Sequence, residues 1–169
     1  VRTIPSSGLI LSNAGEPALE RVLQKGCWTA VERFGLNEGW SAKETGANTF
    51  DVSLNGKALG SVQWGLLGEH NRMNALAAIA AARHVGIDPA ASIAALADFA
   101  NVKRRMEVRG TVNGITVYDD FAHHPTAIDL TLAGLRHKIG SARILAVLEP
   151  RSNTMKLGTM KDRLAGSLA

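Results

Sequence analysis

The residues best suited to do chemistry gather in one short stretch. Residues 117–126 read Val-Tyr-Asp-Asp-Phe-Ala-His-His-Pro-Thr, so an apolar strand pattern ends in carboxylates and imidazoles just before a helical pattern. Polar groups at the carboxyl end of a buried strand are where open α/β sheets bind ligands. Because neighbouring side chains point to opposite faces of a strand, we expect one of Asp119 and Asp120 to face a ligand and the other to support the loop. The alternative is that Asp120, His123 and Thr126 only cap a turn and the helix.

A second polar group precedes a long helical pattern. Residues 68–74 read Gly-Glu-His-Asn-Arg-Met-Asn, and a glycine at a helix N-terminus presents free backbone N–H groups and the positive end of the dipole. Asn71 and Asn74 are three positions apart and therefore share a helix face. An amide side chain both donates and accepts, as adenine requires. The alternative is that these asparagines cap the helix and His70 lies in a turn.

A third group is basic and lies at a change of character in the chain. Residues 103–107 read Lys-Arg-Arg-Met-Glu, and alternation along a strand would send Arg105 and Glu107 to the same face. The planar fork of an arginine suits phosphate oxygens. The alternative is a solvated surface. Nucleic-acid binding is disfavoured, because aromatic residues do not alternate with the basic ones.

A fourth group follows another apolar strand pattern. Residues 149–156 read Glu-Pro-Arg-Ser-Asn-Thr-Met-Lys. Arg151 and Lys156 would suit a substrate that carries carboxylates. Alternatively, Asn153 and its hydroxyl neighbours only cap the next helix.

Two other kinds of site are weaker interpretations. The histidines and aspartates of these groups are numerous enough for a metal, but their spacing matches no compact zinc pattern. A nucleophile elbow of the Gly-x-Ser-x-Gly kind is absent from the sequence. Cys27 is interpreted as a small buried side chain.

The elements that must position these groups define an α/β protein. We predict a domain boundary near residue 102. Before it come a strand over 8–12, a helix around Pro17 and a layer of antiparallel strands. A helix over 71–84 follows, and then a second helix that Asp88 is predicted to cap. The strands of the layer are predicted over residues 29–34, 40–44, 49–54 and 57–64, with Asn55-Gly56 as a type I′ hairpin turn.

The second part is predicted to begin a parallel sheet with right-handed crossovers. Its elements are strands over 106–112 and 115–118 around an Asn113-Gly114 turn, a helix over 126–136, a strand over 142–148 and a helical stretch over 155–168.

Composition sets the class of protein. The chain has 169 residues, 46% of them hydrophobic, and a net charge of +4 with one cysteine. This modest basic excess favours an anionic ligand, and the single cysteine fits a reducing compartment. A signal peptide and a membrane-spanning run are not recognisable, so cytoplasmic is the default expectation. Because the chain begins without methionine and stops within a helical pattern, we expect a piece of a longer protein.

Taken together, the motifs resemble one family. The order and spacing of Gly68-x-His70-Asn71-x-x-Asn74-Ala75, Arg105-Met106-Glu107 and Asp119-Asp120-Phe121-Ala122-His123-His124-Pro125 are similar to those of the Mur ligases. These ATP-dependent enzymes join amino acids or peptides to UDP-N-acetylmuramic acid in bacterial cell-wall synthesis. The resemblance covers essentially the whole chain, but the chain covers well under half of such a ligase.

The resemblance implies a fold and a set of contacts. Residues 1–101 would be the last part of the central ATP-binding domain, and residues 102–169 the first part of a Rossmann-like C-terminal domain that binds the amine substrate. Asn71 and Asn74 would lie at the adenine, Arg105 at the phosphates or ribose, and Asp120 at the ribose. His70 and His124 would also be ATP-binding residues, and His123 would lie beside the same cleft. The substrate contacts expected by resemblance are Arg151, Asn153 and Lys156.

The resemblance also implies cofactors and partners. ATP with Mg²⁺ would activate the carboxylate of UDP-N-acetylmuramate to an acyl phosphate. By resemblance, the sequences of residues 121–125 and 149–156 favour the murein tripeptide L-Ala-γ-D-Glu-meso-diaminopimelate as the amine substrate, with L-alanine as the alternative. A phosphate-binding loop is absent from these residues, and we expect it, the modified lysine and the main Mg²⁺ ligands upstream. The fragment alone is therefore expected to be inactive, and a non-catalytic nucleotide-binding module is a further alternative.

Overall fold

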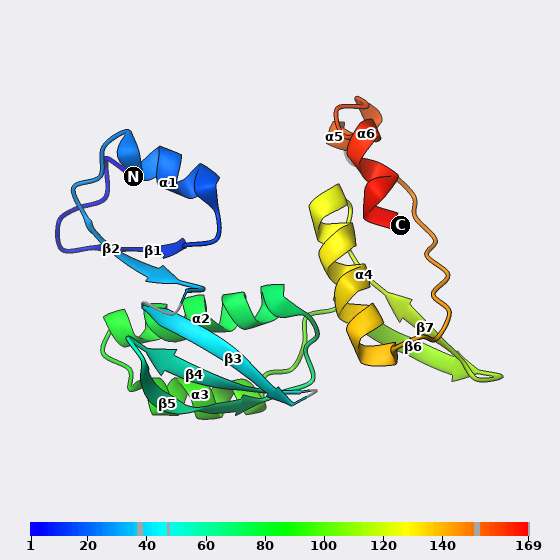
Figure 1. Cartoon of the computed structure of the whole chain (residues 1–169), viewed down its shortest axis with the longest axis horizontal. Helices are drawn as coiled ribbons and strands as arrows, with labels where there is room; N and C mark the ends of the chain where they lie inside the picture. Colours follow the sequence, from blue (N-terminus) through cyan, green and yellow to red (C-terminus); the bar gives the residue numbers. More distant parts are fainter. Residues whose placement is uncertain (37–38, 47, 151–152, 169) are drawn as a thin grey trace. The chain divides into compact units, whose positions relative to one another are not determined.

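The computed structural model of the chain describes residues 1–36, 39–46, 48–150 and 153–168. It forms two compact units (Figure 1). Unit 1 comprises Val1–Gly65 and His70–Phe99, and unit 2 comprises Leu66–Glu69 and Ala100–Ala169. A short segment before residue 70 therefore packs with the second half of the chain.

Unit 1 contains a mixed five-stranded sheet. The first three strands of the order β1-β2-β3-β4-β5 are parallel and the last two pairings are antiparallel. The predicted antiparallel layer is confirmed for β3, β4 and β5. It is wrong for the strand predicted over residues 29–34, because β2 pairs in parallel with both β1 and β3. Asn55 and Gly56 have the positive φ values of 51° and 78° that the predicted turn requires. The strands are β1 Leu9–Asn13, β2 Ala30–Phe34, β3 Trp40–Gly46, β4 Thr49–Leu54 and β5 Lys57–Gln63.

Three helices accompany this sheet, namely α1 Pro17–Gln24, α2 Glu69–His84 and α3 Pro89–Ala97. Alternate residues of β4 are buried, with Phe50 and Val52 at most 2% exposed, which is the period expected of a strand with one face in the core. Leu76 and Ile79 of α2 supply the matching buried helix face. The predicted cap is confirmed, because the Asp88 carboxylate accepts from the Ala90 N–H at 2.9 Å.

Ion pairs hold α2 against the sheet. Arg72 Nη1 lies 2.8 Å from Glu44 Oε2 on β3, and Arg83 Nη1 lies 3.2 Å from Glu32 Oε1 on β2. The Arg83 guanidinium also lies 6.0 Å from the ring centre of the fully buried Trp40. The first and last turns of α2 are therefore both fixed to neighbouring strands.

Unit 2 is built around an antiparallel hairpin and one long helix. Strand β6 Glu107–Val112 pairs with β7 Ile115–Asp119 across a turn in which Asn113 and Gly114 have φ of 51° and 76°, as predicted. Helix α4 Pro125–Ile139 follows, and Ile128 and Leu135 are its buried large side chains. The chain then reaches α5 Asn153–Lys156, α6 Lys161–Leu164 and a 3₁₀ turn Gly166–Leu168 that contacts α4.

Three predictions for unit 2 are wrong. Residues 142–148 form no strand, and the sheet of unit 2 is the antiparallel pair β6–β7, not a parallel sheet. A two-residue turn can only join antiparallel neighbours. Two large apolar side chains of residues 142–148 remain exposed, with Leu145 at 78% and Val147 at 91%. The helical stretch over 155–168 is also broken, because Gly158 adopts a φ of 70° that no helix interior accommodates.

Helix α4 makes one unusually close approach to the chain. A Cβ atom on the buried Gly134 would lie 3.3 Å from Gly68 Cα and 3.6 Å from the Leu67 carbonyl carbon. A glycine inside a helix destabilises it by about 0.5–1 kcal/mol relative to alanine. Here the missing side chain lets the backbone of Leu66–Glu69 pack directly on the helix.

Candidate functional site

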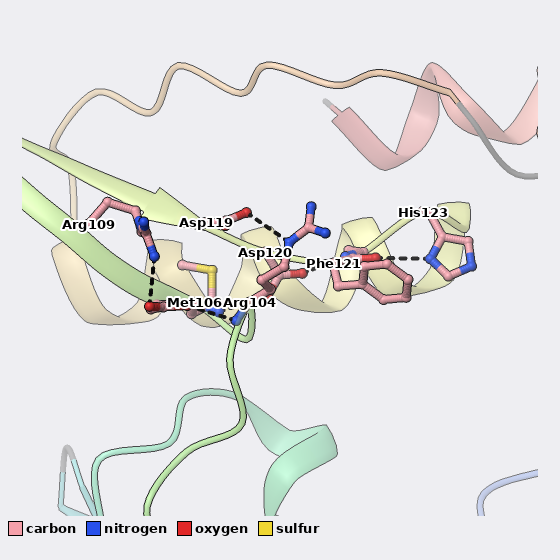
Figure 2. Close-up of polar contacts among 9 residues, drawn as sticks. Arg104, Met106, Arg109, Asp119, Asp120, Phe121 and His123 are labelled. Carbon is pink, nitrogen blue, oxygen red and sulfur yellow. Dashed lines mark hydrogen bonds and ion pairs between the residues drawn. The ribbon is translucent and has the colours of Figure 1, made fainter.

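Two loop segments of unit 2 meet at the start of β6 and the end of β7. Residues 101–107 and 119–124 are called the junction cluster here, and Figure 2 shows the polar contacts that join them. Hydrogen bonds cross between the segments in both directions. The cluster contains four of the residues predicted from the sequence as ligand contacts or their neighbours: Arg105, Asp120, His123 and His124.

Asp120 joins the two segments through both of its carboxylate oxygens. Oδ2 accepts from the Met106 backbone N–H at 2.8 Å, and Oδ1 accepts from the Ala122 N–H at 2.7 Å. Asp120 is therefore the carboxylate that supports the loop, and it caps the turn through Ala122. Each oxygen has a second lone pair, so these contacts do not prevent Asp120 from accepting a further hydrogen bond.

The backbone before β6 has an unusual shape. Arg104 and Met106 have positive φ values of 58° and 51°, which are uncommon for residues other than glycine. Local hydrogen bonds maintain this shape: the Phe121 N–H donates to the Arg104 carbonyl at 2.8 Å, and the Arg104 N–H donates to Glu107 Oε2 at 3.0 Å. Because β6 begins only at Glu107, strand alternation does not extend to Arg105, and that argument for its placement beside Glu107 fails.

The charges of the cluster are unevenly paired. Arg104 Nε lies 3.5 Å from Asp119 Oδ1, and Arg109 Nη1 lies 2.9 Å from Glu107 Oε1. Within the described part of the chain, Arg105 has no carboxylate within ion-pair distance. The cluster therefore presents one guanidinium whose charge is not neutralised.

Glu107 provides a test of this network by pH. The hydrogen bond from the Arg104 backbone holds the pKa of Glu107 below its ordinary value of 4.5, assisted by Arg109. A lowered pKa means that Glu107 binds a proton more readily in the unfolded state than in the folded state. The ionised Glu107 therefore contributes its full stabilisation above the ordinary pKa, and this stabilisation is lost as the pH falls through the pKa of the folded state.

We expect the unfolding free energy of the native chain to fall more steeply than that of Glu107→Gln as the pH decreases from about 5 toward 3. Urea unfolding at a series of pH values measures the difference. Parallel profiles for the two proteins would show that the carboxylate has no such role.

His124 begins α4. Its backbone is extended, Pro125 occupies the first helical position, and Nδ1 accepts from the Thr126 N–H at 3.3 Å. The helix cap is therefore His124, while Thr126 lies inside the helix. Acceptance at Nδ1 places the proton of the neutral ring on Nε2.

Replacing His124 with alanine is expected to destabilise unit 2 by about 1 kcal/mol, because one N–H of the first turn loses its partner. His124→Asn should retain most of the stability, since asparagine is a preferred cap. Chemical denaturation of the three proteins provides the comparison. Equal losses for alanine and asparagine would argue against a capping role.

The other predicted residues lie elsewhere. His70, Asn71 and Asn74 lie in the first turns of α2 and belong to unit 1; His70 and Asn71 are half-buried and Asn74 is exposed. Asn153 begins α5 and is exposed, whereas Arg151 and the side chain of Lys156 lie outside the described residues. Among the residues with described positions, there is no group of three or more His, Cys, Asp or Glu side chains that could hold a metal ion. A helix able to cross a membrane is likewise not found among them.

Sequence reasoning did not single out Phe121. Its ring centre lies 5.4 Å from the Arg104 guanidinium, 5.9 Å from that of Arg105 and 4.9 Å from the His123 ring. In the sequence it appears as one member of the 119–125 motif, a large apolar residue within a mainly polar run.

Comparison with known proteins identifies the family. Residues 104–168 match the Mur ligase, glutamate ligase domain. The chain is 54% identical over 99% of its length to the UDP-N-acetylmuramate–L-alanyl-γ-D-glutamyl-meso-2,6-diaminoheptandioate ligase of Escherichia coli K12. It is 34% identical over 96% of its length to the UDP-N-acetylmuramate–L-alanine ligase of Clostridium acetobutylicum.

A solved structure supports the same assignment. The murein peptide ligase of Psychrobacter arcticus aligns with 99% of the chain at a TM-score of 0.72 and 46% identity. The chain belongs to the Mur ligase family. It spans 37% of the Escherichia coli relative and 36% of the Psychrobacter structure and of the Clostridium relative.

Proposed function

We propose that this chain is part of an ATP-dependent ligase that joins L-Ala-γ-D-Glu-meso-diaminopimelate to UDP-N-acetylmuramate. The observation that carries the proposal is the 54% identity to the tripeptide ligase of Escherichia coli over 99% of the chain. The alternative, that L-alanine is the amine substrate, is less well supported, because the identity to the L-alanine ligase of Clostridium acetobutylicum is 34%. The sequence motifs around Asn71 and Asp120 also support this proposal.

In the proposed reaction the lactyl carboxylate of UDP-N-acetylmuramate attacks the γ-phosphorus of ATP, forming an acyl phosphate as ADP leaves. The tripeptide amine then attacks the acyl carbonyl, so that a C–N bond forms and phosphate departs. Both steps require reactants held in line and phosphoryl charge stabilised. Mg²⁺ would accompany ATP and would help to stabilise the phosphoryl charge.

The proposed residue roles follow from chemistry. Arg105 contacts the phosphates, because the described structure leaves its guanidinium without a carboxylate. Asn71 and Asn74 bind adenine through amide groups that donate and accept. Asp120 binds the ribose with its second lone pairs while its existing contacts hold the loop. His70 and His124 are proposed to bind ATP, and His123 is proposed to lie beside the nucleotide. The residues proposed for the tripeptide carboxylates are Arg151, Asn153 and Lys156.

The test is a ligation assay on the longer enzyme that carries this sequence. Phosphate release dependent on UDP-N-acetylmuramate is expected with the tripeptide and not with free L-alanine. Turnover with L-alanine alone would replace the proposal with the L-alanine ligase, and turnover with neither amine would favour a non-catalytic module. We expect the 169-residue chain alone to show no turnover.

A further inference from the structure

Phe121 is an exposed aromatic residue inside a charged cluster. Nearly half of its surface, 49%, is open to solvent, so burial of the ring alone does not account for its place. Its own N–H donates to the Arg104 carbonyl at 2.8 Å, and its carbonyl lies 2.9 Å from His123 Nδ1. The backbone of Phe121 is therefore fixed to the loop that carries both arginines.

The ring lies beside two cations. The guanidinium carbons of Arg104 and Arg105 lie 5.4 and 5.9 Å from its centre, within the range in which an aromatic face attracts a cation. Arg104 has a second anchor in Asp119 at 3.5 Å. Within the described residues, the ring is the contact that the structure records for the Arg105 guanidinium.

The loop that carries Arg105 has little freedom in its backbone. Residues on both sides of it have positive φ, and Asp120 and Glu107 hold their N–H groups. Strained backbone of this kind is common at ligand clamps. With the backbone fixed by these contacts, the direction of the Arg105 side chain depends on what its guanidinium contacts, and that contact is Phe121.

We propose that Phe121 is a positioning residue that orients the Arg105 guanidinium, and secondarily that of Arg104, toward the phosphates of the nucleotide. The inference rests on the proposed function for its ligand, an oligophosphate anion. The contact between the Phe121 ring and the Arg105 guanidinium leaves the N–H groups at the edge of the guanidinium available. These N–H groups are the donors that a phosphate requires.

The experiment measures binding to the 169-residue chain by calorimetry with ATP, inorganic tripolyphosphate and adenosine. Phe121→Leu retains an apolar side chain without the ring. It is expected to weaken ATP and tripolyphosphate by the same factor, about five- to thirty-fold for two cation–π contacts, and to leave adenosine unchanged. Phe121→Tyr, which keeps the ring, should bind both phosphates within about twofold of the native chain.

A double-mutant cycle identifies the route of the effect. In the Arg105→Ala background, Phe121→Leu should lose most of its effect on tripolyphosphate binding. Arg109→Ala is the matched control, because this exposed arginine pairs with Glu107 and should leave the binding constant unchanged.

Nuclear magnetic resonance adds a readout that does not depend on how the variants fold. Tripolyphosphate should shift the Nε–H signal of Arg105 in the native chain more than that of Arg109. Equal shifts, an undiminished effect of Phe121→Leu in the Arg105→Ala background, or no tripolyphosphate binding by the native chain would overturn the inference. The ligation assay on the longer enzyme remains independent, because it can succeed while all of these measurements fail.

Discussion

Replacing Asp120 with alanine is expected to lower the unfolding free energy of unit 2 by about 2–4 kcal/mol, because hydrogen bonds to charged groups contribute roughly 1.5–3 kcal/mol each. The two bonds lost are those to the Met106 and Ala122 N–H groups at 2.8 and 2.7 Å. We place the total below the sum of two such bonds, since Asp120 is only half-buried. Met106 would also lose the contact that favours its positive φ.

Hydrogen exchange measures this loss unit by unit. Protection should decrease across β6, β7 and the start of α4 in Asp120→Ala, while the sheet of unit 1 keeps its protection. The protection of unit 2 in Asp120→Asn should lie between that of the native chain and that of Asp120→Ala. The reason is that the amide retains one acceptor but turns a donor toward the second N–H. Asp129→Ala removes an exposed carboxylate from α4 and is the control. Equal losses at the two aspartates would contradict the supporting role of Asp120.

Replacing Arg105 with alanine is expected to raise the KM for ATP of the longer ligase by about ten- to a hundredfold, the range for a lost charge-assisted hydrogen bond of roughly 1.5–3 kcal/mol. The physical reason is that Arg105, unlike Arg104 and Arg109, has no carboxylate partner among the described residues. The KM values for UDP-N-acetylmuramate and the tripeptide should change little.

Steady-state kinetics with each substrate varied in turn test this expectation. Arg105→Lys should recover part of the loss, since an ammonium keeps the charge but not the planar fork. Arg109→Ala should behave as the native enzyme. A rise in the KM for the tripeptide in place of that for ATP would move Arg105 from the nucleotide to the amine substrate.

The fold was predictable wherever a local rule is strong. Both Asn-Gly turns form as expected, because each requires two consecutive residues with positive φ. The Asp88 cap and the long α2 follow from equally local patterns. Residues 142–148 show the limit: an apolar run of strand formers predicts burial in a sheet but does not specify a partner strand, and the described structure pairs it with none.

The site was predictable as a location more than as a mechanism. Residue types and their spacing predicted Arg105 and Asp120 as candidate site residues, and the structure places both in the junction cluster. The positive φ of Met106 is not encoded by its residue type, so neither the loop shape nor the hydrogen bond that the Met106 N–H donates to Asp120 was foreseen. Phe121 was missed for a similar reason, because a single apolar residue has no periodicity to interpret.

The close approach of Gly134 to Gly68 has a practical consequence for dissecting this protein. Unit 2 is discontinuous, since Leu66–Glu69 joins it from a point more than thirty positions before Ala100. Excision of the region from Ala100 onward would remove the Leu66–Glu69 backbone that packs on α4 at Gly134, and would expose that part of the helix to solvent. An autonomous version of this half would therefore need the tetrapeptide supplied in trans, or a bulkier residue in place of the glycine.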